Sequence, residues 1–151
     1  MSGDATVEER IRAAQIVVAA LAMGVLTFTG VVVGLVATGG TAPVAGAGMA
    51  SLPLYGAPVA AILLALAPVV RRRILDSGPA RDRAQAVGRW STATIVSMAL
   101  REGAGILGLV LSLLAGSATW AVVFGVASVG AMVLSWPRGD DLRERLRRLP
   151  G

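Results

Sequence analysis

Four long apolar segments dominate this sequence and restrict the folds open to it. They cover residues 13–38, 53–70, 86–114 and 117–136, and each is near or above the roughly 20 residues that a helix needs to cross a bilayer. One such segment is compatible with a buried helix of a soluble protein, but four in 151 residues argue against that interpretation. The sequence therefore predicts an all-α, integral membrane four-helix bundle within residues 1–138, a multi-pass protein of the cell membrane.

The composition agrees with this class and excludes several kinds of chemistry. Hydrophobic residues make up 55% of the chain and charged residues 15%, against about 25% charged residues in soluble domains. The chain has no Cys and no His, which excludes thiol catalysis and removes the usual haem ligands, zinc ligands and general base. The acidic residues, the serines and Tyr55 form no recognisable nucleophile–base arrangement. We therefore expect no enzyme activity, no metal and no cofactor.

The arginines predict the orientation in the membrane. All basic residues are Arg, and thirteen of the fourteen precede the first segment, lie between the second and third or at the start of the third, or follow the fourth. The other two connections, "GGTAPVAGAGMAS" and "AGSAT", carry none. Because cytoplasmic loops of membrane proteins are rich in Lys and Arg, both termini are predicted to be cytoplasmic. This asymmetry explains the net charge of +5 without nucleic acid as a partner.

The C-terminal segment, residues 139–151, has the pattern of a basic amphipathic helix. Leu142, Leu146 and Leu149 recur at three- and four-residue spacing, with Arg on the remaining faces. Such a helix is expected to lie on anionic lipid headgroups as a cytoplasmic tail. The arginines expected to bind the headgroups are Arg71, Arg72, Arg73, Arg143, Arg145, Arg147 and Arg148. Docking of a specific protein on this tail or on the loop "RRRILDSGPARDR" is the alternative.

Small residues suggest where the helices approach one another, because association in lipid depends on close packing. The candidates are Gly30 and Gly34 in "GVVVG", Ala57, Ala61 and Ala65 in the second segment, and Ala121 and Gly125 in the fourth. We interpret them as packing positions within the bundle, with a dimer face as the alternative. Pro58 and Pro68 predict a kink or local unwinding in the second segment.

Arg101 and Glu102 lie side by side within the third apolar segment. Helical spacing places Arg101 on a column of polar or small residues: Trp90, Thr94, Ser97, Arg101, Gly105, Gly108 and Ser112. This column is expected to face protein or water. Glu102 lies about 100° around the helix, so a direct pair between the two neighbours is not guaranteed.

The predicted depth makes these two charges the candidate functional site. Glu102 is about twelve residues, or roughly 18 Å, from the connection "AGSAT", which places it near the middle of the bilayer. Thr27 and Ser128 are the polar residues expected at the same depth, and neither can neutralise a charge. Glu102 is therefore expected to pair with Arg101, in the same chain or in another subunit, or to be protonated.

The runs "REGAGILGLVLSLLAG", "QIVVAALAMGVLTF" and "WPRGDDLRERL" resemble a widespread group of small, uncharacterised four-helix membrane proteins of bacteria. The third helix of that group carries an ALLEGAA-like run, in which an apolar residue usually precedes the Glu; this chain has Arg101 there. The resemblance covers nearly the full length. It implies the four-helix architecture and a location in the bacterial inner membrane, but no activity.

The run "EGAGILGLV" also resembles the ion-binding helix of rotary ATP synthase ring subunits, E-A-x-A-I-Y-G-L-V. Glu102, Ile106, Gly108, Leu109 and Val110 match that pattern, whereas a leucine replaces its tyrosine. The resemblance implies a proton-carrying role for Glu102 on a hairpin whose basic loop faces the cytoplasm.

Two functions are favoured over a membrane enzyme, for which the sequence offers no recognisable nucleophile–base arrangement. The sequence favours a structural or accessory membrane subunit, in a homo-oligomer or with another membrane protein as partner. The alternative is a proton-coupled or ion-translocating membrane element that uses Glu102.

Overall fold

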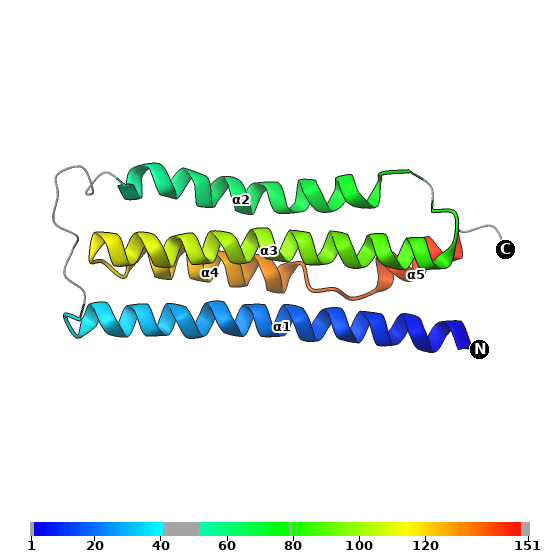
Figure 1. Ribbon diagram of the computed structural model, residues 1–151, viewed down its shortest axis with the longest axis horizontal. Helices are drawn as coiled ribbons and strands as arrows, with labels where there is room; N and C mark the ends of the chain where they lie inside the picture. The colour runs from blue at the N-terminus through cyan, green and yellow to red at the C-terminus, as the bar shows by residue number, and fades with distance from the viewer. Residues whose placement is uncertain (1, 41–51, 79, 149–151) are drawn as a thin grey trace.

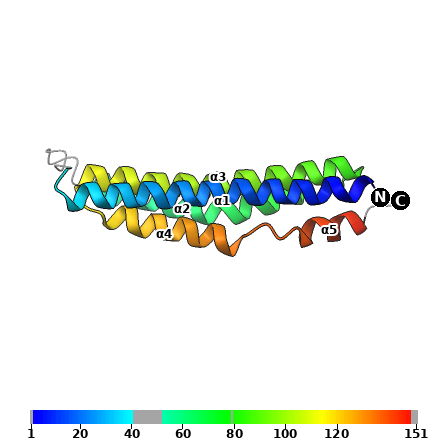
Figure 2. The ribbon, with the colours of Figure 1, turned by 90° about the horizontal axis from the view of Figure 1, so that it is seen from below.

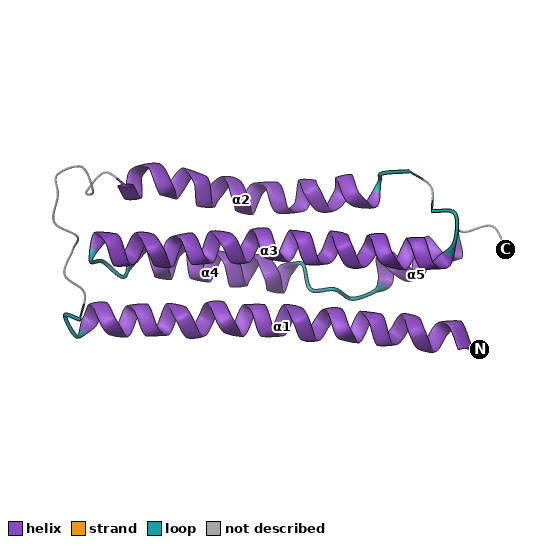
Figure 3. Ribbon diagram, in the orientation of Figure 1, coloured by secondary structure: helices purple, strands orange, loops and turns teal. Residues whose placement is uncertain are grey.

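The protein is all-helical, as the sequence predicts. The computed structural model describes residues 2–40, 52–78 and 80–148, and it contains no strand in these ranges. The five helices are α1 (Ser2–Ala37), α2 (Leu52–Leu75), α3 (Arg83–Ala115), α4 (Thr119–Leu134) and α5 (Asp140–Arg147) (Figures 1 and 3). The connection 41–51, most of the predicted outer loop, lies outside the described residues.

Three of these helices, α1, α2 and α3, are long and apolar enough to span a membrane. The fourth apolar segment forms a shorter helix, because α4 has 16 residues and ends at Leu134 rather than at residue 136. Pro137 follows closely, and a residue that precedes proline disfavours the helical conformation. The first helix is longer than its apolar segment, because α1 begins at Ser2 and includes the polar N-terminal residues. Pro58 and Pro68 both lie inside α2, which continues through them to Leu75.

Helix α3 is the central element of the fold. It packs against α1, α2, α4 and α5, whereas α1 and α2 lie on opposite sides of it and share no close backbone contact within the described ranges (Figure 1). Helices α4 and α5 follow one another along a third side of α3 (Figure 2). The start of α1, the connection between α2 and α3, and α5 lie together at one end of the molecule, which we name the arginine-rich end (Figure 1).

Small residues bring α3 and α4 into close contact. A Cβ atom added at Gly108 would lie 2.6 Å from Cβ of Phe124 and 2.8 Å from the carbonyl oxygen of Trp120. A Cβ atom at Gly125 would lie 2.5 Å from Oγ1 of Thr29, which brings α1 against α4. Because these helices approach one another closely, they can pack in lipid without burying a large apolar area between them.

Only part of the predicted small-residue packing is present. Ala121 and Gly125 are buried, as expected. In contrast, Gly30 and Gly34 have no atom within 4 Å of an added Cβ, so "GVVVG" makes no close approach to any other described part of the chain. Ala61 and Ala65 are exposed and Ala57 is half-buried, because Ala60 and Ala67 form the face of α2 that is fully buried.

Large apolar side chains cover the outside of the bundle. They occur on all four long helices and are exposed over a third or more of their surface; examples are Met23 and Phe28 of α1, Ile62 of α2, Ile106 of α3 and Val126 of α4. The fully buried positions include the small polar residues Ser97, Ser112 and Ser128. This distribution is the reverse of a soluble protein with a fully solvated surface, and it is suited to a lipid environment.

The C-terminal helix α5 packs against the bundle. Leu142 is fully buried (0% exposed) in a cluster with Val7 and Ile11 of α1 and Trp90 of α3, and Leu146 packs at its edge. Gly139 precedes α5 with φ of +78°, a conformation that glycine adopts without strain. The amphipathic pattern of the tail is therefore real, but its apolar face is directed at the bundle rather than outward. Leu149 lies outside the described residues.

Candidate functional site

The polar column of α3 lies in the interior, as its spacing predicts. Its seven members are all buried: Trp90, Thr94, Ser97, Arg101, Gly105, Gly108 and Ser112. The column faces α1 and α4, since Gly105 contacts Val25 and Ser128 and the amide of Ala121 donates a hydrogen bond to Oγ of Ser112 at 2.5 Å. A polar face is thus directed at protein, which removes it from lipid.

Arg101 is a buried cation, with only 4% of its surface exposed. Its Nη1 atom lies 3.6 Å from the sulfur of Met98, and its Nε atom is buried without a hydrogen-bond partner. Met98 precedes Arg101 by one turn, so the side chain leans toward the arginine-rich end. Among the described residues no carboxylate lies within ion-pair distance of this guanidinium.

Ser128 and Thr27, the predicted polar neighbours, differ in their placement. Oγ of Ser128 donates a hydrogen bond to the backbone carbonyl of Arg101 at 2.6 Å, so Ser128 anchors α4 to the site. Thr27 is exposed on α1. The contact between Val25 and Gly105 places Ala22, rather than Thr27, at the depth of Glu102.

Glu102 lies away from Arg101, at the edge of an uncovered face of α3. This face, which we name the open stripe, consists of Thr92, Ile95, Ala99, Ile106, Val110 and Leu113, all of them exposed. An ideal helix places Glu102 about 20° from Ile95 and about 40° from Ile106. Glu102 is half-buried, and its carboxylate forms no ion pair or hydrogen bond with the described residues. The direct pair with Arg101 is therefore not present within the chain.

Two buried hydroxyl groups, one in the column and one on α1, have no hydrogen-bond partner among the described residues. They are Oγ1 of Thr94 and Oγ1 of Thr29. Thr94 belongs to the predicted polar column, whereas sequence reasoning missed Thr29, whose burial depends on the close approach of Gly125 in α4. The interior between α1, α3 and α4 is thus polar but incompletely hydrogen-bonded.

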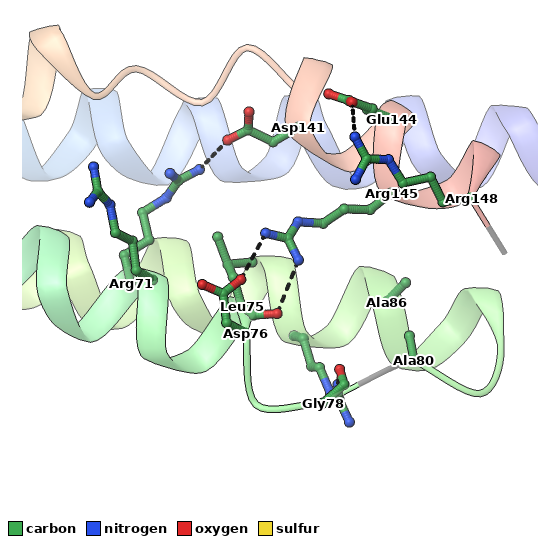
Figure 4. A pocket seen from close by; sticks show the side chains of 12 residues that line it. Arg71, Leu75, Asp76, Gly78, Ala80, Ala86, Asp141, Glu144, Arg145 and Arg148 are labelled. Atoms are coloured by element: carbon green, nitrogen blue, oxygen red, sulfur yellow. Dashed lines mark hydrogen bonds and ion pairs between the residues drawn. The ribbon is translucent and has the colours of Figure 1, made fainter.

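The arginine-rich end contains a cavity of about 600 Å³ between α2, α3 and α5. Two ion pairs cross it (Figure 4): Arg71 binds Asp141 at 2.9 Å and Arg145 binds Asp76 at 3.3 Å. Arg145 also donates to the carbonyl oxygen of Leu75 at 3.0 Å (Figure 4). These contacts join α5 to the end of α2.

Some of the arginines predicted to bind headgroups are engaged by carboxylates of the chain. Arg143 binds Glu8 at 2.8 Å and Asp140 at 3.1 Å. The hydrogen bond that Arg143 donates to Glu8 raises the pKa of Arg143 above its ordinary value. Arg148 pairs with Glu144 within α5. Within the described ranges, the side chains left without a partner in this group are Arg72, Arg73 and Arg147.

No family model, no curated protein and no solved structure matches this chain. Its functional assignment therefore rests on the geometry described above.

Proposed function

We propose that the protein is a multi-pass membrane protein in which the three long helices and the shorter α4 cross the bilayer, with both termini in the cytoplasm, and that it acts as a structural or accessory subunit. The observation that carries this proposal is the exposed apolar surface on α1 to α4, combined with thirteen arginines at the opposite extremity from "AGSAT". Three helices long enough to span a membrane support it.

Tryptophans support a position of the bundle in the membrane, because Trp gathers at membrane–water interfaces. Trp120 begins α4 and Trp136 follows its end, and the 16 residues of α4 span about 24 Å. If the hydrocarbon layer lies between the levels of Trp120 and Trp136, it is thin enough for α4, the shortest of the four helices, to cross it. Glu102 then lies inside the hydrocarbon, nearer to the arginine-rich end, and α1 and α3 extend beyond the membrane into the cytoplasm.

The surroundings of Arg101 and Glu102 support an accessory role. A charge inside the hydrocarbon costs at least about 2.5–3.5 kcal/mol, so such residues are paired or exposed to water. Arg101 is enclosed by the helices of the chain, whereas Glu102 is only half-buried and has no partner among the described residues. A carboxylate on an outer face is suited to contact with another subunit.

The test combines topology and assembly. Reporter fusions at both termini should report the cytoplasm, and a fusion inserted at "AGSAT" should report the outside. Purification in mild detergent followed by native mass measurement should give a stoichiometric assembly. A periplasmic C-terminus contradicts the proposed orientation, and a chain that is always monomeric contradicts the accessory role.

Anionic lipid is the second partner that we propose. Arg72, Arg73 and Arg147 have no carboxylate partner among the described residues and lie at the proposed inner interface. Their guanidinium groups are available to lipid phosphates. In contrast, Arg71, Arg143 and Arg145 take part in ion pairs that join α5 to the rest of the bundle, and Arg148 pairs with Glu144.

A proton-coupled role for Glu102 is the second candidate function. It is favoured by the half-buried carboxylate without a partner at the edge of the open stripe. Glu102→Gln keeps the shape and removes ionisation, so it should abolish proton flux into liposomes while the chain stays folded. Flux that is unaffected by Glu102→Gln excludes this role.

A further inference from the structure

The open stripe of α3 is the side of the central helix that the chain leaves uncovered. Helix α1 packs on one flank through Val25 and α2 on the other, where Leu63 approaches Gly103. Helix α4 covers a further side, so α3 is enclosed except along the stripe (Figures 1 and 2). Ile95 and Ile106 are about half exposed there. Lipid is able to cover these apolar side chains but cannot neutralise the carboxylate at their edge.

The chain itself has no cation for Glu102. Arg101 is buried on another side of α3. The other thirteen arginines lie in the N-terminal part of α1, at the end of α2, in the connection that follows it, at the start of α3, and after α4. A second copy of the chain placed with the same orientation therefore offers Glu102 only its own Glu102 at that depth. Two carboxylates in a low-dielectric contact repel each other unless they share a proton, so the complementary occupant is a different protein.

A groove extends the same side of α3 toward the cytoplasm. It has a volume of about 460 Å³ and lies between α1 and α3, with Val7 and Arg10 on one wall and Ala84, Val87 and Ser91 on the other. Ser91 lies three turns before Glu102 on the same side of α3. The open stripe and this groove together form a continuous path for one additional helix.

We propose that the open stripe binds a transmembrane helix of a partner protein that carries a Lys or Arg at the depth of Glu102. This inference rests on the proposed accessory role and names the chemistry of the partner. Helix association in lipid is driven by packing and by polar contacts across helices, and one buried ion pair specifies register. The partner helix supplies the cation, and Glu102 supplies the anion.

The test uses synthetic transmembrane peptides as defined probes. A Leu/Ala host peptide carries Lys at the depth of Glu102, nearer to its cytoplasmic end than to its outer end, and two matched peptides carry Leu or Glu there. The full-length chain has no Cys, so Ser117→Cys provides a single site for a fluorescent donor, and each peptide carries the acceptor. Energy transfer in bilayer nanodiscs then reports binding as the peptide is titrated.

We expect the Lys peptide to bind at least about tenfold more tightly than the Leu peptide. Glu102→Gln should abolish that difference, whereas Glu9→Gln, at an exposed carboxylate of α1, should preserve it. Ala99→Trp on the open stripe should weaken binding of the Lys peptide, and Val123→Trp on the exposed face of α4 should not. Circular dichroism of each variant establishes that it is folded.

Equal binding of the Lys and Leu peptides overturns the proposal, as does a preference that survives Glu102→Gln. Energy transfer between two copies of the chain that depends on Glu102 and is not displaced by the Lys peptide also overturns it, in favour of a second copy. Either result leaves the accessory role standing, because that role fails on topology and native mass rather than on peptide selectivity.

Discussion

The close contact between α3 and α4 at Gly108 gives the sharpest test of the packing. Replacing Gly108 by Ala places a Cβ atom 2.6 Å from Cβ of Phe124 and 2.8 Å from the carbonyl oxygen of Trp120. Carbon atoms in contact are ordinarily about 3.5–4.0 Å apart, so the helices must separate by about 1 Å. The carbonyl belongs to the backbone and cannot turn aside, and therefore α4 itself has to shift.

The cost follows from two opposing effects. Overpacking of this kind costs about 1–3 kcal/mol, while a change from Gly to Ala inside a helix contributes up to about 1 kcal/mol of stability. Gly130→Ala should gain the helix stabilisation without the cost of overpacking, because no atom lies within 4 Å of an added Cβ at Gly130. The free energy of unfolding should therefore be about 1–3 kcal/mol lower for Gly108→Ala than for Gly130→Ala.

Both variants can be compared by titration with denaturing detergent in mixed micelles, with helix content and tryptophan fluorescence as readouts. Trp120 lies at the contact, so its fluorescence should change early in Gly108→Ala and not in Gly130→Ala. Equal unfolding midpoints in the two variants would refute the close approach of α3 and α4. The same result would remove the explanation for the burial of the polar column.

Other perturbations test the arginine-rich end and the buried cation. Leu142→Ala should lower the free energy of unfolding by roughly 2–5 kcal/mol, because this side chain is fully buried. Leu134→Ala, at a residue that is 88% exposed, should change it little. Equal effects of the two substitutions would contradict the packing of α5. The contribution of the ion pair between Arg143 and Glu8 should not change as pH rises from 7 to 9. Because the pKa of Arg143 is raised, this contribution is fully present below the ordinary pKa of arginine and is lost only as the pH rises through the folded pKa. A fall in stability between pH 7 and 9 that Arg143→Gln removes would contradict this. Replacing Arg101 by Met should leave stability unchanged or raise it, and a loss above about 3 kcal/mol in chemical denaturation would reveal a counter-charge for Arg101.

The helices and the polar column were predictable because both depend on local spacing. The positions of Trp90, Thr94, Ser97 and Ser112 recur at helical spacing, and any neighbour that covers one of them covers the others. The apolar segments likewise predict helices from length and hydrophobicity alone. The end of α4 was displaced by Pro137, a local signal that the apolar pattern does not include.

The packing partners were less predictable because they depend on which faces meet. "GVVVG" and the stretch around Gly108 carry the same type of signal, yet only Gly108 approaches another helix closely. The surface that the apolar face of α5 contacts was equally hard to predict. The sequence around Leu142 is compatible both with a lipid surface and with the cluster around Trp90. Small and amphipathic residues mark surfaces that are able to pack, whereas the tertiary arrangement selects those that do.

Arg101 and Glu102 show how one helical step separates two charges. On an ideal helix Glu102 shares a column with Met98 and Leu109, which are buried, and with Ile95, which is half exposed. Glu102 thus marks the border between the covered and uncovered sides of α3, about 100° from Arg101. A double-mutant cycle of Arg101→Leu and Glu102→Leu in the isolated chain should therefore be additive, because neither side chain compensates the other there. Thermal unfolding in one detergent measures the cycle. A coupling of 1 kcal/mol or more would contradict the separation of the two charges, and additivity leaves Glu102 free to contact a molecule outside the chain.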